Sequence, residues 1–278
     1  MNRLFYTLFF IAMLVIVSAG CQEKDMQEQL VKNLETKYKE LNNNAAYVTA
    51  NGVPIAQELH FVEPDQNFLP QNSRVRQIAL IRHGEPDLVK TGKFTYEEAK
   101  SFIKNYDSVG IVIPDRPFFI LEDTNEVALY TSNVPRAQAT AKYLFGAERD
   151  IVTTSDFREF ERIIGTRRVK MRLPLKYWTT TARIKWMLGL DREGIESFSE
   201  AKERARKGAL ILDSASEDNP KVVLVAHGFL NRYIRKSLEK QGWMVVRDGG
   251  DNYFATTILA KIDTEEESSN NLVTETDP

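Results

Sequence analysis

The chain has 278 residues and a mass of 31.8 kDa, which corresponds to one or two domains of ordinary size. Hydrophobic residues make up 42% and charged residues 27%, a globular composition that excludes a disordered or collagen-like chain. The 37 basic and 39 acidic residues nearly cancel, which argues against a nucleic-acid partner. With one cysteine and three histidines the chain has no internal disulfide framework, and we expect neither a metal site nor a cofactor.

The first 20 residues have the pattern of a signal peptide. Arg3 precedes an apolar run from Leu4 to Val17, which is shorter than the ~20 residues of a membrane span. Ser18–Ala19–Gly20–Cys21 follows, so the only cysteine stands where a lipobox requires it. This segment resembles a bacterial lipoprotein signal, which implies lipid attachment at Cys21 and an extracytoplasmic, membrane-tethered protein. The alternative is an uncleaved anchor helix with a chance cysteine.

Residues 21–73 are predicted to form a tether and linker. An apolar stripe at helical spacing comprises Met26, Leu30, Leu34, Tyr38 and Leu41. The stripe is narrow, and we expect a loosely packed helix, with a short coiled coil as the alternative. Residues 51–73 contain several glycine and proline residues and are predicted to be irregular. At the other end, residues 263–278 carry six acids and no base, which is typical of a solvated disordered tail.

Between residues 74 and 262, β-rich runs alternate with helical patterns. The runs are Val75–Ile81, Val127–Thr131, Val222–Ala226 and Phe254–Ile262. The helical patterns are Tyr96–Asn105, Pro135–Phe145, Glu196–Leu212 and Phe229–Gln241. The first three runs are largely apolar without alternation, as expected for strands that are covered on both faces. The order predicts an α/β fold, a three-layer α/β/α sandwich with a mostly parallel central sheet.

Cationic side chains and histidines follow three of these runs. Arg82–His83–Gly84 follows the first and His227–Gly228 follows the last of the three, while Arg136 opens the helix after the second. Functional groups gather at the carboxyl ends of strands in such sheets, and helix N-termini favour anions. Arginine matches phosphate oxygens with two hydrogen bonds, and a neutral histidine can attack phosphorus. The pattern therefore favours phosphoryl transfer through a nitrogen nucleophile.

Arg-His-Gly, Arg-Ala-x-x-Thr-Ala and the late His-Gly, in this order, resemble the motifs of the histidine phosphatase superfamily, also called phosphoglycerate mutase-like. The resemblance covers about residues 74–262. It implies that His83 is the nucleophile that becomes phosphohistidine. It also implies that Arg82, Arg136 and His227 bind the phosphoryl oxygens and that a glutamate is general acid and then base. A metal-independent phosphatase acting on a phosphorylated small molecule is the function that follows.

The general acid has two candidates. The family's acid usually follows a hydrophobic–arginine pair, and Phe157–Arg158 selects Glu159 on this ground. In much of the family a glycine lies four residues after the acid, and Gly165 selects Glu161 on that ground. We favour Glu159, because the chain beyond Glu161 is unlike the family's short loop.

Departures from the family pattern narrow the range of activities that the resemblance implies. Pro86 and Val89 stand where mutases carry Ser or Thr and Asn, so mutase activity is disfavoured. The late His-Gly differs from the His-Asp of the acid phosphatase branch. Residues 158–185 hold nine bases and two acids, and they form either a cap that attracts an anionic substrate or a solvated basic face. A catalytically inactive binding lipoprotein is the alternative to a phosphatase, and the complete motif set favours the enzyme.

Overall fold

The computed structural model describes residues 25–65, 67, 69, 73–88, 91–106, 108–121, 126–161, 164, 170–190 and 195–263. The predicted signal peptide with Cys21, the tail after Asp263 and part of the basic segment lie outside the described residues. No helix of the described part is both long enough and apolar enough to cross a bilayer.

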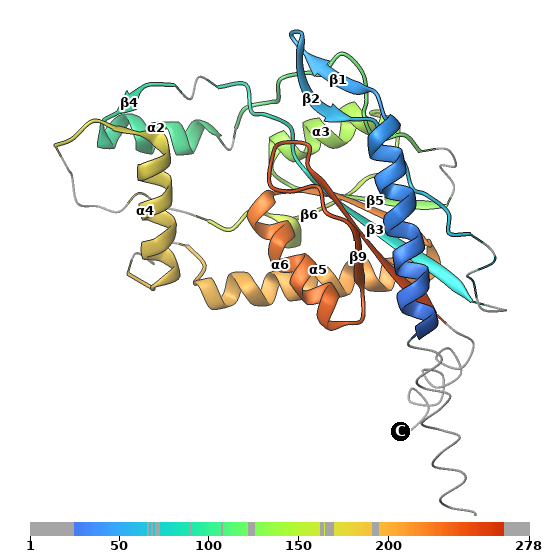
Figure 1. Cartoon of the computed structure of the whole chain (residues 1–278). Coiled ribbons are helices and arrows are strands. Elements are labelled where there is room, and N and C mark those ends of the chain that lie inside the picture. Colours follow the sequence, from blue (N-terminus) through green and yellow to red (C-terminus); the bar gives the residue numbers. More distant parts are fainter. Residues whose placement is uncertain are drawn as a thin grey trace, which may run out of the picture.

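A six-stranded sheet with the order β6-β5-β8-β3-β10-β9 forms the centre of the molecule (Figure 1). Its strands are β3 (Arg74–Arg82), β5 (Val127–Ser132), β6 (Val152–Thr154), β8 (Lys221–Ala226), β9 (Met244–Arg247) and β10 (Thr256–Asp263). The neighbours β6, β5, β8 and β3 run parallel, while β10 is antiparallel to both β3 and β9. The predicted mostly parallel sheet is confirmed, and the four predicted runs are its longest strands.

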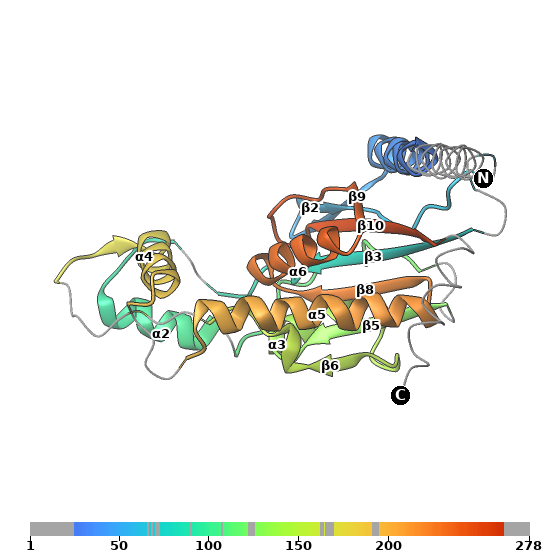
Figure 2. The ribbon, with the colours of Figure 1, turned by 90° about the horizontal axis from the view of Figure 1, so that it is seen from below.

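Helices cover both faces of this sheet. Successive residues of a strand point to opposite sides, so neighbouring residues of β3 contact different helices. Ile78 and Leu80 of β3 pack with α5 (Phe198–Asp218) and α6 (Gly228–Lys240). Ala79 and Ile81 face the other side, with α3 (Pro135–Phe145) and the helix over 25–44. Figure 2 shows α5 running along the sheet. The three-layer α/β/α sandwich is confirmed.

The predicted loose packing of the N-terminal helix is wrong. Leu30 and Leu34 are fully buried and Tyr38 is 1% exposed. The Tyr38 hydroxyl donates to Gln77 Oε1 on β3 over 2.7 Å, and its removal from water raises its pKa. Among the described helices after residue 73, α3 alone packs on this face of the sheet, so the N-terminal helix is needed to cover the remaining apolar surface.

The segment after this helix is also more ordered than predicted. β1 (Tyr47–Ala50) and β2 (Val53–Gln57) pair antiparallel, and β2 lies within the stretch that we expected to be irregular. Leu59 is 1% exposed and belongs to the same core as the N-terminal helix. Residues 25–61 therefore pack as part of the central sandwich.

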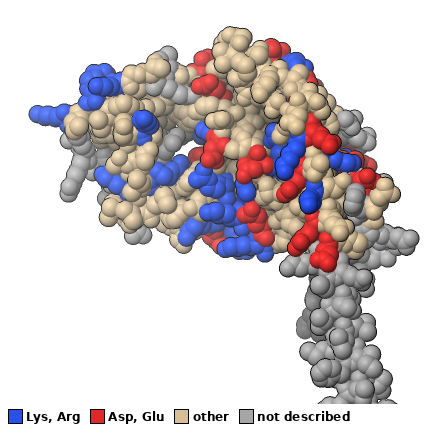
Figure 3. Space-filling model, in the orientation of Figure 1, with Lys and Arg blue, Asp and Glu red and all other residues tan. Residues whose placement is uncertain are grey.

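A smaller unit, here called the cap, lies beyond the carboxyl ends of β3 and β8 (Figures 1 and 2). It comprises β4 (Lys93–Phe94), α2 (Tyr96–Tyr106), β7 (Leu173–Pro174) and α4 (Leu175–Met187). Its own apolar core contains Tyr96, Ala99, Trp178 and Ala182. The described part of the basic segment supplies β7 and α4, and basic side chains predominate on this end in Figure 3. The helix α4 and the short strands were not predicted.

Candidate active site

Two histidines and one arginine meet at the carboxyl edge of the sheet. His83 follows β3, His227 follows β8, and Arg136 is the second residue of α3, which comes after β5. Because β5, β8 and β3 are adjacent, these three chain positions lie together. His83 is 2% exposed, Arg136 1% and His227 0%, and the two imidazole centroids are 5.1 Å apart. The structure thus brings together three of the residues that the motifs selected.

The hydrogen bonds of Arg136 set the tautomers of both histidines, because a guanidinium can only donate. Its Nε donates to His83 Nε2 over 3.1 Å, and an Nη donates to His227 Nδ1 over 3.2 Å. His83 Nδ1–H therefore donates to the Gly84 carbonyl at 2.8 Å. By the same argument, His227 Nε2–H donates to Ser132 Oγ at 2.9 Å. His83 is thus held with the lone pair of Nε2 directed at a cation.

Thr140 explains part of the Arg-Ala-x-x-Thr-Ala motif. It lies one helical turn after Arg136, where its hydroxyl donates to the Arg136 carbonyl over 2.7 Å and accepts from the Gly84 N–H over 2.9 Å. Ala137 and Ala141 of the same motif are fully buried against the sheet. The motif therefore joins α3 to the residue after His83 and fixes the distance between them.

Gly84 is required by close packing. A Cβ atom there would lie 2.4 Å from the ring of Phe254, a buried residue beside β10. A side chain at this position would displace Phe254 or move the backbone that carries His83. The glycine of the Arg-His-Gly motif is therefore needed so that Phe254 can pack against the backbone beside His83.

Two tyrosines flank His83, and sequence reasoning missed both. Tyr106, the last residue of α2, has its ring centroid 6.3 Å from that of His83, and Tyr253 lies at 5.7 Å. Their hydroxyl oxygens are 3.3 Å apart, within hydrogen-bond distance. Tyr253 precedes the last predicted strand, which is the only sequence signal for it. Nothing in the sequence pattern pointed to Tyr106 or to the particular contacts of Ser132 and Thr140.

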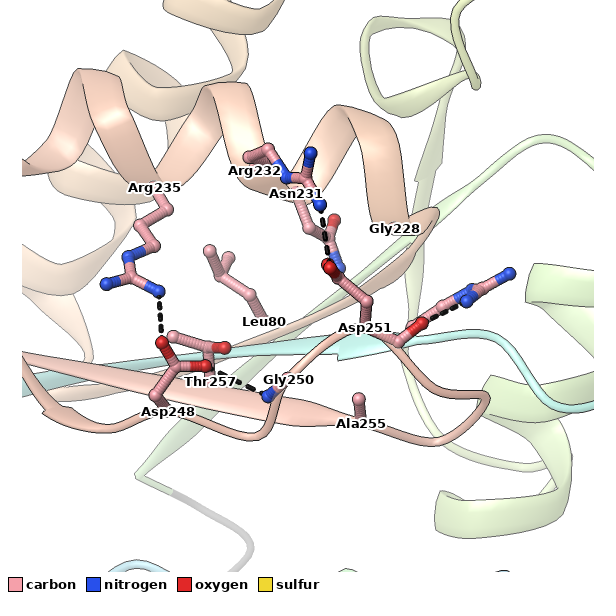
Figure 4. A pocket seen from close by; sticks show the side chains of 11 residues that line it. Leu80, Gly228, Asn231, Arg232, Arg235, Asp248, Gly250, Asp251, Ala255 and Thr257 are labelled. Atoms are coloured by element: carbon pink, nitrogen blue, oxygen red, sulfur yellow. Dashed lines mark hydrogen bonds and ion pairs between the residues drawn. The ribbon is translucent and has the colours of Figure 1, made fainter. Parts of the chain in front are cut away.

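The described contacts of the Arg82 side chain do not include His83 or His227. The Arg82 guanidinium carbon lies 4.3 Å from the Tyr253 ring centroid, and an Nη donates to the Asp251 carbonyl. The side chain also lines a hollow of about 230 Å³ between α6 and the connection 248–255 (Figure 4). The described contacts of Arg82 therefore tie it to this connection, while its predicted role at the phosphoryl group stays a prediction.

Ion pairs join the two walls of this hollow. Arg232 on α6 pairs with Asp251 over 2.7 Å, and Arg235 pairs with Asp248 over 2.7 Å (Figure 4). The Arg235 guanidinium and the Gly250 N–H hold the pKa of Asp248 below its usual range. These contacts fasten the connection that carries Tyr253 to the helix that follows His227.

The segment with the two candidate acids follows β6 and the short helix η2 (Ser155–Phe157). Glu159 accepts a hydrogen bond from the Phe160 N–H over 2.9 Å, while Glu161 pairs with Arg158 over 3.0 Å. Neither contact reaches the histidines, so the choice between Glu159 and Glu161 stays a prediction.

Two arginines hold the backbone of this segment. Arg204 of α5 donates to the carbonyls of Asp156 and Arg158, at 3.1 and 2.6 Å. Arg183 of α4 donates to the Phe160 carbonyl over 3.1 Å. The segment is thus anchored to the sandwich on one side and to the cap on the other.

The arrangement around His83 suits attack on a bound phosphoryl group. An unprotonated Nε2 can form a bond to phosphorus, and the neighbouring guanidinium can stabilise oxygens that carry negative charge. Within the described residues, no group of three or more His, Cys, Asp and Glu side chains is placed to hold a metal ion.

Solved structures of similar proteins are distant in sequence. A mycobacterial hydrolase is 20% identical with a TM-score of 0.40, and the match covers 69% of this chain and 84% of that one. A mycobacterial glucosyl-3-phosphoglycerate phosphatase is 20% identical with a TM-score of 0.39, over 67% and 91% of the two chains. A phosphoserine phosphatase from Entamoeba histolytica is 16% identical with a TM-score of 0.38, over 68% and 95%. No curated protein matches the chain significantly.

The sequence model of one family matches more than half of the chain. Residues 119–267 match the histidine phosphatase superfamily (branch 1). The matched range contains Arg136, Glu159 and His227, and it begins after Arg82 and His83. Together with the three motifs in their expected order, this match establishes that the chain belongs to the histidine phosphatase superfamily.

Proposed function

We propose that this protein is a metal-independent phosphatase that hydrolyses phosphomonoesters of small molecules at His83. The observation that carries the proposal is the buried group of His83, Arg136 and His227, in which Arg136 contacts a nitrogen of each histidine. Membership of the histidine phosphatase superfamily supports the same class of reaction. In this proposal the guanidinium groups supply the positive charge that a metal ion supplies in other phosphatases.

The reaction takes place in two steps. His83 Nε2 attacks phosphorus while the bond to the ester oxygen breaks, and the leaving oxygen takes a proton from the carboxylic acid of Glu159. The Glu159 carboxylate then takes a proton from water as the water oxygen attacks phosphorus. The nitrogen–phosphorus bond breaks, which releases inorganic phosphate and restores neutral His83. Arg136 holds the phosphoryl oxygens in both steps. Arg82 and His227 join it when they turn from the Asp251 carbonyl and from Ser132 Oγ.

The proposed location of the protein is the extracytoplasmic face of a membrane, where a lipid on Cys21 tethers the chain. The support is the apolar run that ends in Ser-Ala-Gly-Cys. Replacement of Cys21 by Ser should abolish incorporation of labelled palmitate and release the protein from the membrane fraction. Undiminished labelling of the Cys21→Ser protein would contradict this part of the proposal alone.

The chemistry is tested with the full chain and p-nitrophenyl phosphate. His83→Ala should lower kcat by at least about 1000-fold, as is usual when a nucleophile is lost. His60→Ala is the matched control, because His60 lies in the segment after β2 and belongs to none of the three motifs. EDTA should leave wild-type activity unchanged. An active His83→Ala protein would refute the assignment of His83 as the nucleophile. An inactive wild-type protein would favour a binding lipoprotein without catalysis.

A further inference from the structure

The group around His83 is closed to solvent. His83, Arg136 and His227 are each at most 2% exposed, so a phosphomonoester cannot reach Nε2 in this conformation. Some part of the surrounding structure must move before a substrate enters. The rings of Tyr106 and Tyr253 lie beside His83 and are the candidates for this movement.

Tyr106 and Tyr253 connect the cap to the sandwich next to His83. Tyr106 ends α2 of the cap and is 8% exposed, while Tyr253 belongs to the connection 248–255 before β10. Both rings lie close to the His83 imidazole, with centroids 6.3 and 5.7 Å away. The hydroxyl–hydroxyl hydrogen bond of 3.3 Å joins the two units at this point.

Each tyrosine also contacts one arginine of the motifs. The Arg136 guanidinium carbon lies 4.6 Å from the Tyr106 ring centroid, and an Nη of Arg136 donates to the Tyr106 carbonyl over 3.1 Å. The Arg82 guanidinium carbon lies 4.3 Å from the Tyr253 ring centroid. Stacking on an aromatic ring restrains the plane of a guanidinium and is favourable for a cation.

We propose that the Tyr106–Tyr253 pair is the gate of the phosphoryl site and that its rings position Arg136 and Arg82. The proposal rests on the proposed function at His83 and adds two positioning residues to it. Opening breaks the hydrogen bond between the hydroxyls and separates the cap from the connection 248–255. Closing around a bound ester returns both rings to their arginines and excludes water from the phosphoryl group.

Removing one hydroxyl should favour the open state without removing a ring. A neutral hydrogen bond contributes modestly to such an equilibrium, so Tyr106→Phe and Tyr253→Phe should each raise access to His83 by roughly fivefold. Access is measured as the rate at which diethyl pyrocarbonate modifies His83 in the full chain, read by peptide mass mapping. Labelling of His60 in the same sample is the internal reference, and inorganic phosphate should slow labelling of His83.

A control variant separates this effect from a general loosening of the fold. Tyr143 donates to the Pro114 carbonyl over 2.8 Å, so Tyr143→Phe removes a hydrogen bond of similar kind from another part of the sandwich. It should leave the rate at His83 unchanged. If both gate variants label His83 at the wild-type rate, or if Tyr143→Phe accelerates labelling equally, the gate is refuted.

The ring of Tyr253 is tested by comparing two substitutions. Tyr253→Leu removes the aromatic face under Arg82 and should lower kcat/KM for p-nitrophenyl phosphate by roughly tenfold. Tyr253→Phe keeps the ring and should recover most of that loss. Equal losses in the two variants would refute the positioning role. If the wild-type protein is inactive but His83 is labelled faster in the Phe variants, the proposed function is refuted and the gate is still supported.

Discussion

Replacement of Arg136 by lysine tests the central feature of the site. Three different nitrogens of the Arg136 guanidinium donate to three partners, which are His83 Nε2, the Tyr106 carbonyl and His227 Nδ1, at 3.1, 3.1 and 3.2 Å. Lysine has one nitrogen at the end of a flexible chain, so it cannot reach partners that surround a planar fork. We expect Arg136→Lys to keep one of these contacts and lose two.

The size of the effect follows from the number of lost contacts. A hydrogen bond from a charged group contributes about 1.5 kcal/mol at the lower end of its range, so two lost bonds amount to about 3 kcal/mol. If this loss falls on the transition state, kcat/KM decreases on the order of 100-fold, since about 1.4 kcal/mol corresponds to a factor of ten. Arg136 is 1% exposed, so water cannot replace the missing donors in the closed conformation.

The assay is steady-state hydrolysis of p-nitrophenyl phosphate, with thermal unfolding of the same samples recorded by circular dichroism. Arg206→Lys is the matched control, because Arg206 is an exposed arginine of α5 that pairs with Glu203. It should change kcat/KM by less than about twofold. A value of kcat/KM for Arg136→Lys within threefold of wild type would refute the reasoning, since it would mean that the fork is not needed.

Three further predictions concern the core, a tight connection and the general acid. Leu34→Ala should destabilise the protein by about 2–5 kcal/mol, measured by urea unfolding, because Leu34 is fully buried; a loss below about 1 kcal/mol would contradict the packing of the N-terminal helix. Gly249→Ala should lower the melting temperature by several degrees, since its Cβ would lie 2.3 Å from the Thr256 carbonyl oxygen, whereas Gly110→Ala has open space and should be tolerated; equal melting temperatures would refute this. Glu159→Gln should slow hydrolysis of an alkyl phosphate strongly and spare p-nitrophenyl phosphate, whose leaving group hardly needs a proton; the same selectivity in Glu161→Gln instead would reassign the acid.

Much of the central sandwich could be predicted from the sequence, because local patterns carried it. Ile78 to Ile81 are apolar at consecutive positions, as expected for a strand that is buried on both faces, and the helical patterns between the runs predicted the covering layers. His83, Arg136 and His227 were found because each directly follows a strand, or opens the helix after one, and strand ends of a parallel sheet meet at one edge.

Other features depended on contacts between distant parts of the chain. The stripe of Leu30, Leu34 and Tyr38 was visible in the sequence, but its burial depends on an uncovered face of the sheet that no local pattern reports. Likewise, Tyr106 and Tyr253 are 147 residues apart, and only the placement of the cap beside the connection before β10 brings their hydroxyls together. The sequence by itself determined the layers and the motif residues, since the hydrophobic period and the succession of strands and helices along the chain can be read locally. The tertiary structure decided which side chains enclose His83 and where Arg82 points, because these depend on how separate elements pack.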